Sequence, residues 1–231
     1  MIKCFKLKSI LLPIAIILIS AIISIGIVAV TELTDTPFLP YCIVLDAGHG
    51  YNDNGCSGTN GGIESDINLE ITFKLEKILK DFGFKVVLTR KDKNGLYDED
   101  APNHKVSDME KRKDIITQAN PDFVISIHCN SYPDTSLRGA QAFYKKDNEE
   151  SLNLATAIQE TLTSQIPYAK KEANFGDYYI LNESPANAVL IECGYLTNPE
   201  DEALLISPDH QQKLAYAIAC GIVKYFDIAK D

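Results

Sequence analysis

The sequence lacks a CxxC spacing, an internal repeat and an excess of basic charge. Five of its six cysteines follow residue 41, and an odd number without that spacing indicates neither a disulfide framework nor a zinc ribbon. Most of these cysteines are expected to be small buried hydrophobic residues. The 22 basic side chains are outnumbered by 32 acidic ones, which gives a formal net charge of -10. This balance makes nucleic acid a poor partner.

An almost unbroken apolar run extends from Ile10 to Val30, and three lysines but no acid precede it. Its length is sufficient to cross a bilayer. We therefore predict that residues 1–30 form a cytoplasmic basic tip and a transmembrane signal-anchor, with everything that follows on the extracytoplasmic side. A cleaved signal peptide is the alternative, but its apolar core would be shorter and would end in a small-x-small site. The segment Ile27–Val30 does not provide a convincing one.

Residues 31–40 contain two prolines and little periodicity, so they are predicted to be a linker. Residues 41–228 are predicted to form one catalytic domain. Its first half alternates between buried apolar runs and helical periodicity. The predicted order is strand 41–46, helix 64–82, strand 84–89, helix 107–118 and strand 123–128. This alternation predicts an α/β fold with a mixed, mostly parallel twisted sheet and helices on both faces.

The second half is predicted to add three strands and two helices. The strands are expected at 139–144, 178–181 and 188–192, and the helices at 150–165 and from Ser207–Pro208 onward. Ser107 with Glu110 has the spacing of a capping box at the start of the helix predicted over 107–118.

Two of the four histidines, His49 and His128, stand where a buried strand gives way to a glycine or polar loop. That carboxyl edge is where ligands bind in open α/β sheets. Either histidine alone is as well explained by a hydrogen bond to the loop backbone, but the pair favours a metal. A catalytic zinc site usually has three protein ligands and one open position. Glu64 could be the third ligand, although the helix dipole alone also explains an acid at that position.

Other polar residues compete for roles near these histidines. Glu192 closes an apolar strand, where an acid is unusual without a partner or a task, and it could be a fourth ligand or a general base. Asp46 and Asp53 are rival carboxylates close to His49, and Asp46 could equally bond loop amides. Cys129 and Cys193 directly follow proposed site residues, so strand alternation directs them to the opposite face, into the core.

Six ordered motifs between about Tyr41 and Phe226 resemble the zinc-dependent N-acetylmuramoyl-L-alanine amidases of the amidase-3 family. These motifs are Asp46–Gly50, Glu64 with Asp66–Leu69, Leu88–Arg90, Arg112 with Ala119–Asn120, Ser126–Asn130 and Ile191–Asn198.

The resemblance implies that His49, Glu64 and His128 bind one zinc ion and that Glu192 is the catalytic glutamate. It also implies hydrolysis of the amide bond between N-acetylmuramic acid and L-alanine in bacterial peptidoglycan. The first alternative is another zinc-dependent wall hydrolase, a carboxypeptidase or a deacetylase. The second is a non-catalytic wall-binding protein on the same fold.

The loop Tyr51–Cys56 departs from the family pattern, which leaves the role of Asp53 open. The single N-terminal anchor, without a separate wall-binding repeat, resembles the spore-cortex, germination-specific branch, which prepares muramic δ-lactam. The protein is expected to be anchored in the membrane, with its catalytic domain on the extracytoplasmic side, in the cell wall or the forespore intermembrane space. Peptidoglycan and the membrane are the expected partners. An accessory regulatory protein is compatible with the sequence, which does not identify one.

Overall fold

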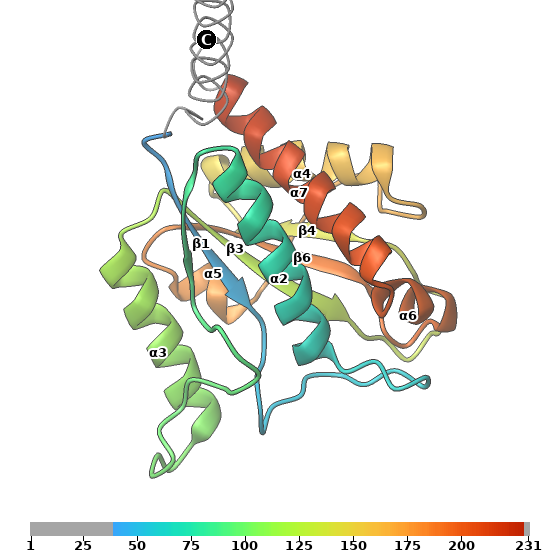
Figure 1. Cartoon of the computed structure of the whole chain (residues 1–231), viewed down its shortest axis with the longest axis horizontal. Helices are drawn as coiled ribbons and strands as arrows, with labels where there is room; N and C mark the ends of the chain where they lie inside the picture. Colours follow the sequence, from blue (N-terminus) through green and yellow to red (C-terminus); the bar gives the residue numbers. More distant parts are fainter. Residues whose placement is uncertain (1–38, 229–231) are drawn as a thin grey trace, which may run out of the picture. The chain divides into compact units, whose positions relative to one another are not determined.

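Six strands form one mixed sheet in residues 39–228, the part of the chain that the computed structural model describes (Figure 1). The strand order is β2-β1-β3-β6-β4-β5. All neighbouring strands are parallel except β4 and β6, which are antiparallel. The strands are β1 (Cys42–Ala47), β2 (Lys85–Leu88), β3 (Phe123–Asn130), β4 (Gln141–Tyr144), β5 (Asn174–Phe175) and β6 (Asn187–Tyr195). The prediction of a mixed, mostly parallel sheet is confirmed.

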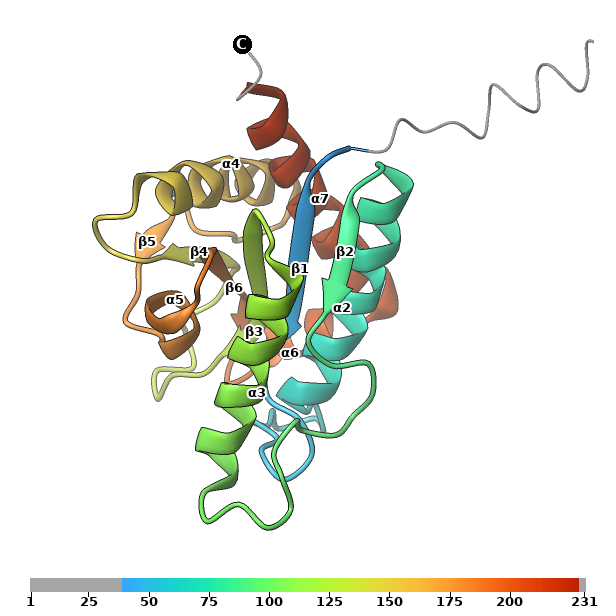
Figure 2. The ribbon, with the colours of Figure 1, turned by 90° about the vertical axis from the view of Figure 1, so that its left-hand side faces the viewer.

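Helices cover both faces of this sheet, as predicted (Figure 2). One face packs against α2 (Glu64–Asp81), α4 (Glu149–Gln165) and α7 (Pro208–Ile228). The other face packs against α3 (His104–Ala119) and the short α5 (Tyr179–Glu183). A further short helix, α6 (Pro199–Leu205), follows β6.

Strand alternation divides the core between the two faces. In β1, Ile43 and Leu45 belong to the cluster under α2, α4 and α7, while Val44 belongs to the cluster under α3 and α5. Every residue of β1 is buried, because a parallel strand with helices on both sides has no solvent face. The even-numbered residues of β1 therefore face α3, and Asp46 lies on that side of the sheet.

The first long helix matches its prediction closely. Ile67, Ile71, Leu75 and Leu79 are buried at helical spacing along α2. The helix ends at Asp81, and Gly83 follows with a positive φ of 92°. A glycine in that conformation is a common helix terminator.

Two local predictions are wrong. Helix α3 begins at His104, because the side chain of Asn103 caps it by accepting from the Val106 amide, and Ser107 instead accepts from the Asp98 amide. Residues 178–181 contribute to α5 rather than to a strand. Their short apolar run is compatible with either structure, and burial of Ile180 against the sheet favours the helix.

The prediction also missed β5 and α6. Strand β5 has two residues, too few to produce a periodic signal. Helix α6 did carry a signal, since Asn198 caps it and Pro199 occupies its first turn.

The predicted anchor, residues 1–30, and most of the predicted linker, 31–40, lie outside the described residues. Within residues 39–228, no helix combines the length and apolar character needed to cross a membrane. Leu39 already belongs to the folded unit, since its amide donates to the Gly83 carbonyl at 2.9 Å.

Candidate metal centre

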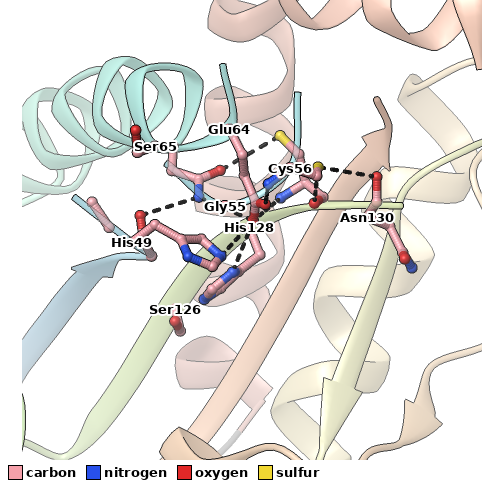
Figure 3. A network of polar contacts seen from close by, with 12 residues as sticks. His49, Gly55, Cys56, Glu64, Ser65, Ser126, His128 and Asn130 are labelled. Carbon is pink, nitrogen blue, oxygen red and sulfur yellow. Dashed lines mark hydrogen bonds and ion pairs between the residues drawn. The ribbon is translucent and has the colours of Figure 1, made fainter. Parts of the chain in front are cut away.

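The three predicted ligands converge at the carboxyl ends of β1 and β3 (Figure 3). His49 follows β1, His128 lies near the end of β3, and Glu64 opens α2. One oxygen of Glu64, Oε1, lies 3.1 Å from His49 Nε2 and 3.1 Å from His128 Nδ1. One potential ligand atom from each of these residues lies within 4.8 Å of the others. The fold thus unites residues that are separated by as many as 79 positions in the sequence.

The carboxylate of Glu64 is buried and held by main-chain donors. The Cys56 amide donates to Oε2 at 2.8 Å, and the Cys129 amide donates to Oε1 at 3.2 Å. Burial opposes ionisation, but hydrogen bonds and charge from His128 and His49 hold the pKa of Glu64 well below its usual range. The carboxylate therefore stays anionic and pointed between the two imidazoles.

His49 is oriented from both sides. Its backbone is left-handed, with φ of 62°, and its Nδ1 lies 2.9 Å from Asp53 Oδ2, so Nε2 faces Glu64. A carboxylate on the far nitrogen is the usual support of a metal-binding histidine. Burial lowers the pKa of His49, but Glu64 and Asp53 outweigh it and raise the pKa to about 9. Glu64 and Asp53 thus favour the positively charged form of the His49 imidazole.

Two glycines leave room for the converging side chains. A Cβ on Gly48 would lie 2.3 Å from the His128 ring, and a Cβ on Gly55 would lie 2.3 Å from Glu64 Oε2. Gly55 also has a left-handed φ of 68°. Any side chain at either position would displace a candidate ligand.

Two buried arginines hold the loop that carries His49. Arg112 donates to the carbonyl oxygens of Ala47 at 2.8 Å and His49 at 2.6 Å. Arg90 donates to the carbonyl of Gly48 at 3.0 Å. These bonds satisfy main-chain acceptors that the end of the strand leaves unpaired. Both arginines therefore hold the main chain of this loop in place.

Asp46 is not part of the group of converging donors, and no bond from its carboxylate to a loop amide occurs in residues 39–228. Its carboxylate accepts from Thr89, Ser126 and Arg112 at 2.7, 2.6 and 2.6 Å. Burial raises its pKa, but Arg112 and the two hydroxyls together lower it to about 2. Asp46 therefore pairs with Arg112 rather than competing as a ligand.

Glu192 lies beside His128 on the neighbouring strand. The two residues are in register between β3 and β6, so their side chains emerge on the same face of the sheet. Only 6% of Glu192 is exposed, and within the described residues its Oε2 has no hydrogen-bond partner. Burial raises its pKa to about 7, with the charge of His128 opposing and that of Glu64 adding to the shift. A buried acid of this kind suits proton transfer near neutral pH.

The cysteines behind these residues are core residues, as predicted. Cys129 and Cys193 are free, buried on the opposite face, and belong to the cluster under α2, α4 and α7. Burial raises the pKa of Cys129 well above its usual value. A thiol in that state is a poor nucleophile.

The separations of the two imidazoles from Glu64 fit a tetrahedral ion such as zinc. Bonds of about 2.0–2.1 Å to nitrogen and oxygen place neighbouring tetrahedral ligands about 3.3 Å apart. The two Glu64 contacts at 3.1 Å are close to this separation. Three ligands would leave a fourth position open, which is typical of catalytic rather than structural sites.

An α/β sheet with two imidazoles, a carboxylate and a nearby buried acid at its carboxyl edge is the arrangement expected of a metal-dependent hydrolase. Residues 43–224 match the amidase-3 family model, described as N-acetylmuramoyl-L-alanine amidase, and the chain belongs to this family. The resemblance seen in the sequence motifs is confirmed.

Several amidases of known name are similar to this chain. The germination-specific N-acetylmuramoyl-L-alanine amidase of Bacillus subtilis (strain 168) is 34% identical over 189 residues, which cover 80% of this chain and 79% of the relative. The CwlD amidase from Clostridioides difficile, solved in complex with the GerS lipoprotein, superposes with a TM-score of 0.77 at 36% identity, covering 81% of this chain and 99% of that one.

A third relative is the catalytic domain of the amidase CwlV from Bacillus (Paenibacillus) polymyxa var. colistinus. It has a TM-score of 0.72 and 29% identity, and covers 81% of this chain and 99% of that one. The protein is thus an N-acetylmuramoyl-L-alanine amidase that acts on peptidoglycan.

Proposed function

We propose that this amidase uses one zinc ion held by His49, Glu64 and His128, with Glu192 as the general base. The observation that carries the proposal is the convergence of three donor groups within 4.8 Å of one another. Beside them stands a buried acid, Glu192, one oxygen of which has no partner in the described part of the chain. Asp53 and Arg112 act as positioning residues, because one orients the His49 ring and the other fixes its main chain.

A zinc ion held by His49, Glu64 and His128 would supply Lewis acidity and would lower the pKa of the water that attacks the lactyl carbonyl. Glu192 accepts the proton of that water as the carbonyl carbon is attacked. The carbon–nitrogen bond then breaks, and Glu192 returns the proton to the departing alanine nitrogen. The products are a muramoyl carboxylic acid and a free L-alanine amino terminus. Cys129 and Cys193 take no part, since they face away into the core.

Product analysis on intact peptidoglycan tests the reaction. New muramoyl carboxyl groups and L-alanine amino termini are the expected ends. Free D-alanine would instead support a carboxypeptidase, and free amino sugars would support a deacetylase. Glu192→Gln is expected to keep zinc and lose hydrolysis, whereas an unchanged rate would remove Glu192 from the mechanism. A protein that binds the wall without cleaving it would release no new ends.

The biological setting is proposed on the germination-specific relative and on the N-terminal apolar run. We place the enzyme in spore-cortex modification, where it prepares muramic δ-lactam, with residues 1–30 in the membrane and the catalytic domain on the extracytoplasmic side. A lipoprotein is the proposed class of accessory partner, since the CwlD relative was solved with one. Loss of muramic δ-lactam from the cortex of a deletion strain is the expected result. A cortex of unchanged composition would contradict this setting.

A further inference from the structure

A cleft of about 460 Å³ opens beside His49 and His128 on the α3 and α5 side of the sheet. Its volume falls within the range of small-molecule sites. Four tyrosines contribute to its lining, and we call it the tyrosine cleft: Tyr51, Tyr97, Tyr178 and Tyr179.

The side chains of Tyr51 and Tyr179 are open to solvent. They are 62% and 48% exposed, and they stand on the glycine loop and at the start of α5. Tyr97, which also lines the cleft, is held by two contacts: its ring stacks on His104 with centroids 4.3 Å apart, and its hydroxyl accepts from the Asn52 side chain. The cleft therefore offers flat apolar faces with hydroxyl groups at their rims.

The lining of the cleft contains three carboxylates, Asp46, Asp53 and Asp108, which offset its cationic side chains, Arg112 and Lys105. Arg112 pairs with Asp46 and Asp108, each at 2.6 Å. Lys105 is close enough to Asp53 to contribute to the lowering of that carboxylate's pKa. An anionic stem peptide would find little unmatched positive charge here.

The sheet also offers no backbone partner to an extended peptide at this place. His128 of β3 and Leu190 of β6 line the cleft, and both strands are already paired on each side in the described sheet. Peptides that bind by adding a strand need an unpaired edge. A neutral ring with an apolar face and polar substituents fits the lining better than a charged chain does.

We propose that the tyrosine cleft binds a sugar ring of the glycan strand next to the scissile lactyl amide, by stacking on Tyr51 and Tyr179. The inference rests on the proposed function, because it takes the site of cleavage to be beside His49 and His128. It assigns the glycan to the α3 and α5 side of the site, so the stem peptide leaves in another direction.

Two substrate series test this assignment with the full chain. One series keeps the stem peptide constant and lengthens the glycan from monosaccharide to tetrasaccharide. The other keeps the glycan constant and lengthens the peptide from L-alanine alone to the full stem. The variants are Tyr51→Ala and Tyr179→Ala, with Tyr51→Phe and Tyr179→Phe to keep the stacking face. Tyr216→Ala is the matched control, since Tyr216 is 50% exposed on α7, outside the cleft.

Extending the glycan is expected to raise the kcat/KM of the wild type. In the alanine variants this increase is expected to be about fivefold to tenfold smaller, mainly because KM is higher. The phenylalanine variants are expected to retain most of that gain, and Tyr216→Ala all of it. A loss that follows peptide length instead of glycan length would overturn the inference, as would unchanged kinetics in both alanine variants. Cleavage by the wild type at bonds other than the lactyl amide would contradict the proposed function itself, and this inference with it.

Discussion

The buried guanidinium of Arg112 donates to the main-chain carbonyl of His49 at 2.6 Å. The same group is paired with Asp46, so a charged side chain from α3 fixes both the end of β1 and the loop beyond it. The main chain of His49 is therefore held by a residue that is not itself one of the three candidate ligands.

Replacing Arg112 should destabilise the folded protein. We expect Arg112→Met to lower the free energy of unfolding by about 3–5 kcal/mol, because it leaves the Asp46 charge buried and unpaired. Urea unfolding measures this change. Lys111→Met is the control, since Lys111 pairs with Asp98 at the surface, and its stability should equal that of the wild type. Equal losses in both variants would contradict the role of Arg112.

The same pair predicts how stability depends on acid. The pKa of Asp46 is lowered to about 2 in the folded protein, below its value in the unfolded chain. Its contribution of about 2 kcal/mol is therefore complete above about pH 4 and is lost as the pH falls toward 2. Asp46→Asn should be less stable than the wild type at neutral pH but should lose less stability across that acid range. Parallel pH profiles would contradict this expectation.

Asp53 should control metal affinity through His49. We expect Asp53→Asn to weaken zinc binding about 10- to 100-fold, because the ring loses the carboxylate on Nδ1. Competition with a chromogenic chelator measures the affinity. Asp134→Asn is the control, since Asp134 only caps Ser136 in a separate exposed loop. An affinity equal to that of the control would show that Asp53 does not support His49.

Glu202 of α6 should stabilise the loop that precedes Glu64. Its buried carboxylate accepts from the amides of Asn60 at 2.7 Å and Gly62 at 3.0 Å. Glu202→Gln should lower the free energy of unfolding by about 2 kcal/mol. The charge-assisted bonds weaken, and the new side-chain amide places a donor against main-chain donors. Thermal unfolding measures the loss. Glu200→Gln, on the exposed side of the same helix, should lose much less, and a similar loss there would refute the role of Glu202.

The parts of this protein that the sequence could predict are those set by local pattern. His49, His128 and Glu192 were found because each interrupts or closes a buried apolar run, and parallel strands bring such ends to one edge. Glu64 needed the family resemblance as well, since a helix dipole also explains it.

The remaining features depend on contacts between distant segments. The pairing of Arg112 with Asp46 spans 66 positions, and that of Glu202 with Gly62 spans 140. Neither produces a periodic signal. The tyrosine cleft was missed for a related reason, because residues 178–181 were predicted to be a strand, whereas α5 places Tyr178 and Tyr179 beside the site.

The central claim is that His49, Glu64 and His128 share one zinc ion, and metal analysis of the purified full chain tests it most directly. We expect one zinc per chain in the wild type and in Glu192→Gln, and almost none in Glu64→Ala that retains its fold by circular dichroism. A folded wild type that takes up no zinc on reconstitution, or a Glu64→Ala variant that binds zinc as tightly as the wild type, would contradict it.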